Sequence, residues 1–285
     1  MSVHIIADSG STKCEWCIIN GNKKKVILTK GINPYFMTIE ETVQLLTEEL
    51  LPTLKKNTIE AIHFYGTGLG NVNNVLKIKA ALKQVFGKTK IEIQTDLVGA
   101  ARAMCNKEKG VVCILGTGSN SCFYNGKTIV KNHTSLGYIL GDEGSGAYLG
   151  KQVIRYYLYN TFDDDLRSRF DAKYVTTPHE IIENTYTKPF TNRYLSSFTT
   201  FLAENRGHYM IENIIEDGLS EFFYHHIYKY RESWTHPIHF VGGVAYAFKD
   251  ILKEMCSDFE LEIGKINASP MKGLIEYHKE KVKKK

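Results

Sequence analysis

Two short turns rich in glycine and hydroxyl side chains are the parts of this sequence best suited to hold a small ligand. They comprise residues 8–13 and residues 116–120, and strand-like runs flank both. Glycine lets backbone approach a ligand closely, and exposed N–H groups with hydroxyls form a concave anion site. A tight hairpin alone would explain either turn. The duplication favours one anion, most naturally a phosphate, gripped from both sides.

Neither turn matches the common nucleotide-binding loops. A Walker loop or a dinucleotide fingerprint leads into a helix, whereas each of these turns leads into a strand-like run. The glycine-rich residues 66–70 do lie between a strand-like and a helix-like run. They lack the spacing of the third glycine, so they indicate a dinucleotide site only weakly.

Composition favours a globular protein with one large or two medium domains. The chain has 285 residues, 43% of them hydrophobic, and no run of eighteen apolar residues or signal-peptide pattern. Five lysines minus one glutamate in residues 279–285 contribute +4 of the net charge of +5. The body is therefore almost neutral, and we expect a cytoplasmic protein with no nucleic-acid or membrane partner.

The six cysteines are expected to be reduced and mostly buried. Cys14 and Cys17 form a C-x-x-C pair, but residues three apart on a strand face opposite sides of the sheet. A shared metal or redox role is therefore not expected.

The order of the expected elements repeats once along the chain. The first series has strands at 3–7, 13–19, 25–29, 61–65 and 90–94, with helices at 39–54 (capped by Thr38), 72–86 and 97–105. The second has strands at 110–115, 121–124, 128–131, 238–241 and 260–263, several helices within 144–230, and helices at 244–256 and 271–281.

This repeat predicts a duplicated α/β protein with a cleft between its halves. We expect an N-terminal domain of residues 1–107 and a C-terminal domain of residues 108–270 with a helical insertion. A helix within 271–285 could pack back on the first domain. The two turns would then face each other across the cleft.

Five segments in this order resemble one known group of proteins. They are residues 7–13, 95–101, 115–120, 137–146 and 240–244. The chain is similar to the N-acetylglucosamine kinases of the BadF/BadG/BcrA/BcrD-type ATPase group, in the sugar-kinase and actin superfold. The resemblance implies two duplicated ribonuclease H-like (actin/hexokinase-type) α/β domains that bind ATP and Mg²⁺ in the interdomain cleft. It also leaves a homodimer possible.

The resemblance assigns the nucleotide contacts to three glycine-rich segments. Phosphate binding is implied for Gly10, Ser11, Thr12, Lys13, Gly116, Thr117 and Gly118. Close backbone approach to the adenosine is implied for Gly242 and Gly243, although a plain strand-to-helix turn would also explain this pair. Asp8 is implied to hold Mg²⁺ through water, because a hard cation needs oxygen ligands.

Asp96 is the residue expected to carry catalysis. It follows a strand and precedes a helix, where ligands gather in α/β sheets, and we place it at the helix N-cap. The resemblance implies that it accepts the proton of the sugar hydroxyl that attacks the γ-phosphorus. A purely capping Asp is the alternative. With an ordinary pKa near ~3.9 it would be a weak base.

The sugar-binding residues come from the resemblance as well. They are Asn33, Asp96, Thr117, Gly137 and Asp142. Asn33 precedes a proline and is equally a turn former. Thr117 could bind either sugar or phosphate. Asp142 and Glu143 are adjacent, so at most one should face a ligand.

The choice of sugar stays open. Many members of the group carry Gly-Trp-Gly where this chain has Leu136-Gly137-Tyr138. N-acetylglucosamine, giving the 6-phosphate, is the favoured acceptor, while glucosamine, N-acetylmuramic acid and another hexose are alternatives. A non-catalytic, sugar-responsive ATP-binding module is the rival class, and the presence of Asp96 disfavours it.

Overall fold

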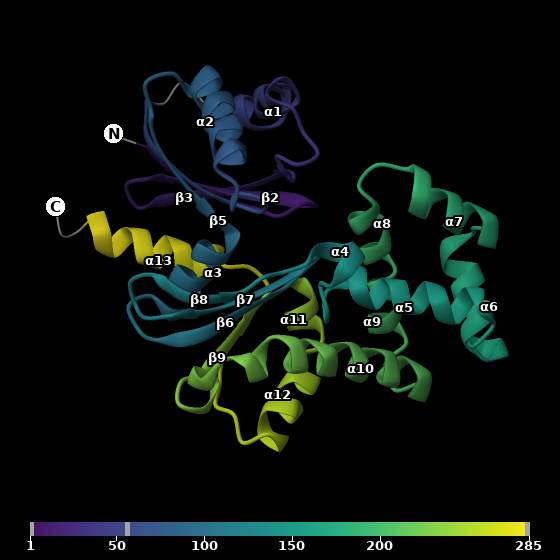
Figure 1. Ribbon diagram of the computed structural model, residues 1–285. Coiled ribbons are helices and arrows are strands. Elements are labelled where there is room, and N and C mark those ends of the chain that lie inside the picture. Colours follow the sequence, from purple (N-terminus) through teal and green to yellow (C-terminus); the bar gives the residue numbers. More distant parts are fainter. Residues whose placement is uncertain (1–2, 55–57, 283–285) are drawn as a thin grey trace. The chain divides into compact units, whose positions relative to one another are not determined.

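The structure, a computed structural model, describes residues 3–54 and 58–282, and the backbone alone for 280–282. The lysines at 283–285, part of the basic tail, lie outside the described residues. The chain divides into two compact units (Figure 1). Unit 1 comprises Met1–Glu108, Gly126–Ile129 and Ser269–Lys285, and unit 2 comprises Lys109–Asn125 and Val130–Ala268.

Unit 1 is built on a five-stranded mixed sheet of order β3-β2-β1-β4-β5. The strands are β1 (Val3–Ser9), β2 (Lys13–Asn20), β3 (Lys23–Lys30), β4 (Ile59–Gly66) and β5 (Lys90–Thr95). The first three form an antiparallel meander, as expected from the polar turns, while β4 and β5 continue the sheet parallel to β1.

Helices cover both faces of this sheet (Figure 1). On one face, α1 (Ile39–Leu45) and α2 (Val72–Phe86) bury Leu45, Ile78 and Leu82 against the strands. On the other, α3 (Asp96–Cys105) and α13 (Met271–Val282) bury Ala103 and Leu274.

The predicted helix over 39–54 is only partly regular. Thr38 caps it as predicted: its hydroxyl accepts the Glu41 N–H at 3.1 Å, and the Glu41 carboxylate accepts the Thr38 N–H at 2.7 Å. The α-helix ends at Leu45, and Leu46–Leu50 forms a π-helical turn before the 3₁₀ turn Leu51–Thr53. Pro52 has no N–H to donate, so a regular helix could not continue through it.

The cysteines confirm the interpretation of the C-x-x-C pair. Cys14 packs in the core under α1 and α2, whereas Cys17 packs with α3 and α13 on the opposite face. All six cysteines are buried, and none is in a disulfide. The two thiols of the pair therefore pack on opposite faces of the sheet.

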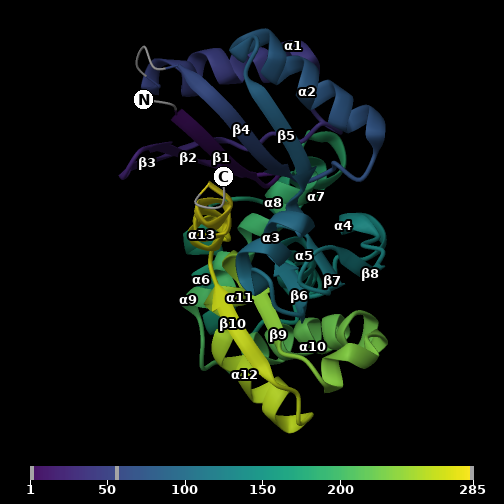
Figure 2. The same ribbon diagram turned by 90° about the vertical axis from the view of Figure 1, so that its left-hand side faces the viewer.

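Unit 2 has a second five-stranded sheet, of order β10-β9-β6-β7-β8. Its strands are β6 (Gly110–Leu115), β7 (Ser119–Tyr124), β8 (Ile129–His133), β9 (Ile238–Val241) and β10 (Ile263–Asn267). The β6–β7 hairpin is antiparallel, and β9 and β10 extend the sheet in parallel from β6 (Figure 2).

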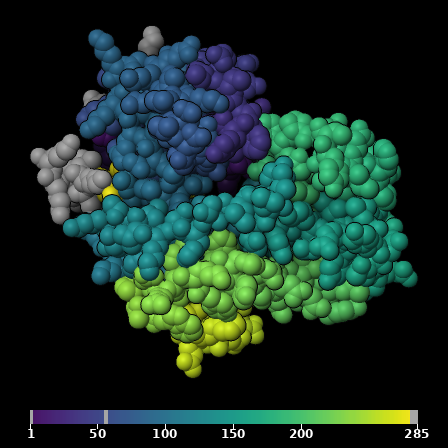
Figure 3. Space-filling view, viewed as in Figure 1, coloured from purple at the N-terminus to yellow at the C-terminus, as the bar shows by residue number. Residues whose placement is uncertain are grey.

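The helices of unit 2 fall into two groups, one between β8 and β9 in the chain and one after β9. A short α4 (Gly137–Leu140) precedes the insertion, which forms a lobe of teal and green atoms (Figure 3). Its helices are α5 (Gly146–Leu158), α6 (Asp164–Tyr174), α7 (Pro178–Thr187), α8 (Thr191–Ser197), α9 (Thr199–Glu204) and α10 (Tyr209–His225). The 3₁₀ turns Ile227–Lys229 and Arg231–Trp234 then lead to β9, and α11 (Gly243–Ala247) and α12 (Lys249–Asp258) follow it.

Two elements near the end of unit 2 differ from the sequence expectation. The helix predicted over 244–256 breaks at Phe248, whose ring is fully buried, giving α11 and α12. The strand predicted at 260–263 begins only at Ile263, because Glu260 adopts a left-handed φ of 52° and the Leu261 N–H bonds the Cys256 carbonyl at 2.8 Å. This turn delays the strand.

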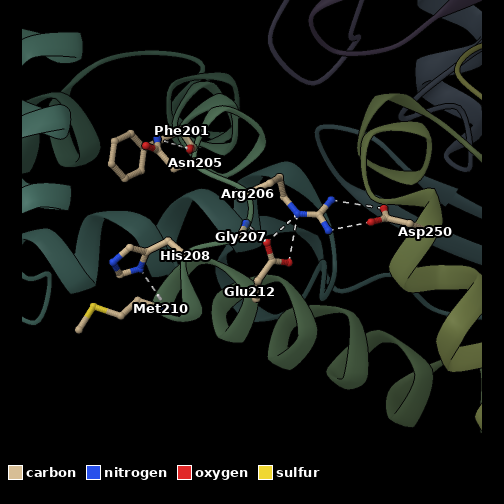
Figure 4. Close-up of polar contacts among 8 residues, drawn as sticks. All are labelled: Phe201, Asn205, Arg206, Gly207, His208, Met210, Glu212 and Asp250. Carbon is tan, nitrogen blue, oxygen red and sulfur yellow. Dashed lines mark hydrogen bonds and ion pairs between the residues drawn. The ribbon is translucent and has the colours of Figure 1, made fainter.

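Arg206 braces the region around that break (Figure 4). Its guanidinium donates from Nε to Glu212 at 2.9 Å and from Nη2 to Asp250 at 2.7 Å, which links the α9–α10 loop to α10 and α12. The Glu212 carboxylate also accepts the Gly207 N–H. These bonds hold the start of α12 beside Phe248.

Among the described residues, no helix is long and apolar enough to cross a membrane.

Candidate active site

The carboxyl ends of three parallel strands in unit 1 lie in register. Ser9 of β1 pairs with Gly66 of β4, and Gly66 pairs with Thr95 of β5. Residues at the ends of these strands therefore share one edge of the sheet, where α/β proteins bind ligands. This edge carries Asp8 and Asp96, and also Thr67, whose N–H bonds the Ser9 carbonyl at 2.9 Å.

Asp96 is the first residue of α3, which corrects its predicted place at the N-cap. Thr95 is the N-cap, and its hydroxyl accepts the Val98 N–H at 3.2 Å. Because β5 pairs through Thr95, that residue stays extended and takes the capping role. Asp96 Oδ1 accepts the Leu97 N–H at 2.8 Å, and the Thr67 hydroxyl also hydrogen-bonds the Asp96 side chain.

Two carboxylates at this edge, Asp8 and Asp96, have raised pKa values. Burial raises the pKa of Asp96 to about 6, against the lowering effect of its hydrogen bonds. Burial, followed by the charges of Asp96 and Glu15, raises the pKa of Asp8 to about 7. The expected ordinary pKa of Asp96 was wrong, because the sequence did not show the burial of its carboxylate. A raised pKa makes Asp96 a stronger base than a free carboxylate.

Glu15 and Thr67 belong to this edge although the sequence analysis did not single them out. Glu15 lies directly opposite Asp8 in the β1–β2 hairpin, and its Oε2 accepts a hydrogen bond of 2.7 Å from Ser269, just before α13. Alternation in the hairpin puts residues 8 and 15 on one face, which would have indicated Glu15. Thr67 depends on β4 pairing in parallel with β1, which no local pattern encodes.

The donor set at the edge suits a hydrated divalent cation. Mg²⁺ keeps several waters and is bound by one or two carboxylates together with substrate phosphates. No group of three or more His, Cys, Asp or Glu side chains in the described part of the chain could enclose a metal ion. Asp8 offers a carboxylate whose raised pKa reflects burial and neighbouring negative charge, so a cation would be stabilised there.

The first turn packs tightly against the loop that follows β3. The Gly10 N–H bonds the Lys13 carbonyl at 3.0 Å, and the Gly31 N–H bonds the Thr12 carbonyl at 3.1 Å. A Cβ on Gly31 would lie 2.3 Å from the Gly10 carbonyl oxygen. Glycine at 31 is therefore needed for this approach, whereas Ser11 is half-buried and Gly10, Thr12 and Lys13 remain exposed.

Asn33 contacts this turn directly. Its Nδ2 donates to Ser11 Oγ at 2.9 Å, and its Oδ1 accepts the Tyr35 N–H at 3.0 Å. The side chain is buried, with 5% of the residue exposed. Asn33 therefore forms the local turn and positions the Ser11 hydroxyl, while its contact with a sugar stays a prediction.

The second turn, in unit 2, is backed by the start of α5. The Gly116 N–H bonds the Gly118 carbonyl at 3.0 Å across the turn. The carbonyls of Gly116 and Thr117 accept the N–H groups of Gly146 and Ala147 at 2.8 and 3.0 Å. The turn is thus held by backbone bonds, and Thr117 lies at its centre.

Asp142 is folded against this turn. A Cβ on Gly118 would lie 2.8 Å from Asp142 Oδ2, and Ser135 donates to Asp142 Oδ1 at 2.7 Å. Asp142 adopts a left-handed φ of 58°, and burial raises its pKa. Glu143 diverges toward His226, at 3.6 Å, as expected of adjacent carboxylates. Gly137, with a φ of 75°, begins the short α4 that precedes this loop.

The two glycines after β9 have different surroundings. A Cβ on Gly242 would lie 2.2 Å from the Leu115 carbonyl oxygen, and its φ is 129°. Gly242 is therefore required for the chain to pass the end of β6, next to the second turn. A Cβ on Gly243 would meet nothing within 4 Å, so the backbone at the start of α11 is open to a ligand.

The structure thus gathers the predicted site residues into two groups. Unit 1 holds Asp8, Gly10, Ser11, Thr12, Lys13, Asn33 and Asp96 at one edge of its sheet. Around the end of β6, unit 2 holds Gly116, Thr117, Gly118, Asp142, Gly242 and Gly243, and Gly137 begins α4 before the loop that carries Asp142. Chemically, the first group offers carboxylates and hydroxyls, and the second offers open backbone with one buried carboxylate.

Comparison with known proteins accounts for almost the whole chain. The model of the BadF/BadG/BcrA/BcrD ATPase family matches residues 7–273. Two crystal structures described as "putative N-acetylglucosamine kinase" resemble this chain. The protein from Porphyromonas gingivalis is 37% identical with a TM-score of 0.91, covering 96% of this chain and 98% of its own. The protein from Chromobacterium violaceum is 16% identical with a TM-score of 0.77 over the same shares.

A more distant likeness concerns the fold alone. A ROK family glucokinase from Streptomyces griseus, in complex with glucose and AMPPNP, is 14% identical with a TM-score of 0.56, covering 96% of this chain and 97% of its own. No protein of curated function matches the chain. The α/β class and the two-domain, actin-like fold expected from the sequence are confirmed.

Proposed function

Because the chain belongs to the BadF/BadG/BcrA/BcrD ATPase family, we propose that it is an ATP-dependent kinase that phosphorylates a hydroxyl of an amino sugar. N-acetylglucosamine, giving N-acetylglucosamine 6-phosphate, is the favoured acceptor. The likeness to the P. gingivalis protein, at 37% identity over nearly the full length of both chains, supports this choice. Glucosamine, N-acetylmuramic acid and other hexoses are the alternatives.

The observation that carries the proposal is the environment of Asp96. Its carboxylate is held by Leu97 N–H and Thr67 at the carboxyl edge of the sheet, with a pKa raised to about 6. In the proposed reaction the sugar oxygen attacks the γ-phosphorus, Asp96 accepts the hydroxyl proton, and ADP leaves with the electrons of the broken P–O bond. A site that lacks such a base could bind ATP but could not accept the proton of the sugar hydroxyl.

The phosphate turns would bind the triphosphate. We propose that Gly10, Ser11, Thr12 and Lys13 contact it from unit 1 and that Gly116, Thr117 and Gly118 contact it from unit 2. Gly243, with open space at its Cα, supports an adenosine contact at the start of α11. Asp8 would hold a hydrated Mg²⁺, which would supply charge neutralisation for the phosphates.

The sugar would be bound by polar groups beside both turns. Asn33 and Asp96 would hydrogen-bond it in unit 1, and Gly137, Asp142 and Thr117 in unit 2. The contacts of Asn33 with Ser11 and of Asp142 with Ser135 support these roles, because each polar group is fixed before a ligand arrives. Homodimerisation is a further prediction and rests on family resemblance.

An ADP-release assay over a panel of sugars tests the proposal. The panel contains N-acetylglucosamine, glucosamine, N-acetylmuramic acid and glucose, each with and without Mg²⁺. We expect Mg²⁺-dependent ADP release that N-acetylglucosamine stimulates most. The absence of sugar-stimulated ADP release across the whole panel would favour the non-catalytic ATP-binding module instead.

A further inference from the structure

His226 is a buried histidine of unit 2 that takes no part in the proposed reaction. It directly follows α10, only 4% of the residue is exposed, and burial lowers the pKa of its ring, which is therefore neutral at pH 7. Its Nδ1 lies 3.2 Å from Ser121 Oγ of β7, and its Nε2 lies 3.6 Å from Glu143 Oε2. The ring therefore joins the strand after the second turn to the loop that carries Asp142.

The carboxylate beside the ring determines which nitrogen carries the proton. An ionised carboxylate only accepts hydrogen bonds, so the nitrogen that faces Glu143, Nε2, is the protonated one. Nδ1 is then an acceptor, and the Ser121 hydroxyl donates to it. The Tyr230 hydroxyl donates to Ser121 in turn, at 2.9 Å, and accepts the His133 N–H at 3.1 Å. These groups form a chain of polar contacts in which every donor points toward Glu143.

The loop at the end of this chain is held in an unusual backbone conformation. Asp142 adopts a left-handed φ of 58°, which a residue other than glycine keeps only where its surroundings determine it. On one side of the loop, Ser135 donates to the Asp142 carboxylate at 2.7 Å. On the other side, a Cβ on Gly144 would lie 2.9 Å from Phe222 Cβ of α10. Phe222 stacks on the His226 ring with centroids 4.7 Å apart, so His226 belongs to this second anchor.

We propose that His226 is a positioning residue for acceptor binding, which acts through Glu143 to hold the loop of Asp142 in the conformation that binds sugar. This inference rests on the proposed sugar kinase function and adds a residue that touches neither substrate. Loss of the ring nitrogens would remove the contact with Glu143 and loosen the loop on its α10 side. Asp142 would then be less well placed for the sugar, whereas the second turn would keep its own backbone bonds.

Paired substitutions of His226 test this role. His226→Leu removes both nitrogens and is expected to lower kcat/KM for N-acetylglucosamine about tenfold, with the KM for ATP unchanged. His226→Gln keeps an N–H that can reach Glu143 and is expected to stay near the wild-type value. The matched control is His225→Leu, because the neighbouring His225 is exposed and pairs with Glu221 of its own helix at 3.2 Å.

Two outcomes of this comparison would overturn the proposal. One is a His226→Leu variant with the kcat/KM of the wild type. The other is an equal loss in His226→Leu and His226→Gln, which would show that the ring only fills space.

Glu143→Ala approaches the same contact from the loop, so it tests the proposal even where His226→Leu does not fold. We expect it to lower kcat/KM for the sugar about tenfold as well. The double variant should fall no further, since both substitutions remove one contact. Losses that multiply in the double variant, or a Glu143→Ala variant that matches the wild type, would contradict the proposal.

Nitrogen-15 NMR of the histidine rings tests the chain of contacts without any turnover. At pH 7 the His226 ring should carry its proton on Nε2, and Ser121→Ala should shift the Nδ1 signal because the donor is lost. A proton on Nδ1 of the wild-type ring would reject the proposed chain.

Calorimetric titration with N-acetylglucosamine separates this inference from the proposed function. His226→Leu should bind the sugar with a Kd about tenfold above that of the wild type. This result without phosphoryl transfer would support the positioning role and reject the kinase. Equal Kd values together with normal turnover would reject the positioning role and retain the kinase, and a wild type that binds no sugar would reject both.

Discussion

The two glycine turns look alike in sequence but are supported by different chemistry. The turn of unit 1 lies beside Asp8, Glu15 and Asp96, and burial of Asp8, followed by the charges of Asp96 and Glu15, raises the pKa of Asp8 to about 7. The turn of unit 2 is supported by backbone bonds from the start of α5 and by the close passage of Gly242. The turn of unit 1 thus has ionisable side chains beside it, whereas the turn of unit 2 is held mainly by its backbone.

The largest expected effect concerns the carboxylates of unit 1. Asp96→Asn should lower kcat by about 10²–10⁴-fold, because the amide cannot accept the sugar proton. Binding of ATP, measured by calorimetry, should be unchanged. The matched variant in unit 2 is Asp142→Asn, which should mainly raise the KM for sugar. Similar kcat in Asp96→Asn and the wild type would remove Asp96 from the mechanism.

The next prediction tests the backbone packing beside the turn of unit 2. Gly242→Ala should lower the free energy of unfolding by about 2–4 kcal/mol, because its Cβ would meet the Leu115 carbonyl oxygen and its φ of 129° suits only glycine. Urea denaturation gives the measurement. Gly243→Ala is the neighbouring control and should unfold like the wild type, since its Cβ has open space. Equal loss of stability in both variants would contradict the packing argument.

A third prediction concerns the cost of assembling carboxylates in unit 1. The pKa of Asp8 rises from 3.8 in the unfolded chain to about 7 when folded, so the unfolded state holds fewer protons between these values and stability falls as pH rises. Asp8→Asn should therefore increase the free energy of unfolding by about 1–3 kcal/mol at pH 8 and have little effect at pH 4.

Thermal denaturation at the two pH values provides the measurement. An Asp8→Asn variant that is destabilised at pH 8 would show that the carboxylate is not under electrostatic strain. Asp142→Asn serves as the comparison from unit 2. Its pKa is also raised by burial, but the Ser135 hydrogen bond opposes the shift, so a smaller gain is expected.

The smallest effect is the pH dependence of the reaction itself. A base must be deprotonated to act, so kcat/KM should fall about tenfold per pH unit below the Asp96 pKa of about 6. Asp96 and Asp8 interact, so the profile reports the pair. The residual activity of Asp96→Asn should lose this dependence near pH 6. A profile that is flat from pH 5 to pH 8 would argue against a carboxylate base.

Local patterns predicted the hairpins, most of the helices and the residues of both turns. They failed where distant residues decide the outcome. Thr95 replaces Asp96 as the N-cap because β5 stays paired through residue 95. Thr67 and the raised pKa of Asp96 depend on burial and on parallel pairing between β1 and β4, which the sequence of either strand does not contain.

A local turn, by contrast, explains the misplaced last strand. Apolar residues near 260 suggested a strand, yet the left-handed Glu260 and the bond from Leu261 to Cys256 complete the turn after α12 first. The start of α12 is instead fixed from outside, by Arg206. A local turn therefore sets the start of the strand, and a tertiary contact sets the start of α12.

Phosphorus NMR of a mixture of the protein, Mg²⁺, ATP and N-acetylglucosamine tests the central claim most directly. The account predicts a new phosphomonoester signal that grows as ADP forms, and a signal that grows at least about a hundredfold more slowly with Asp96→Asn. ADP accompanied only by inorganic phosphate, or no consumption of ATP with any sugar of the panel, would contradict it.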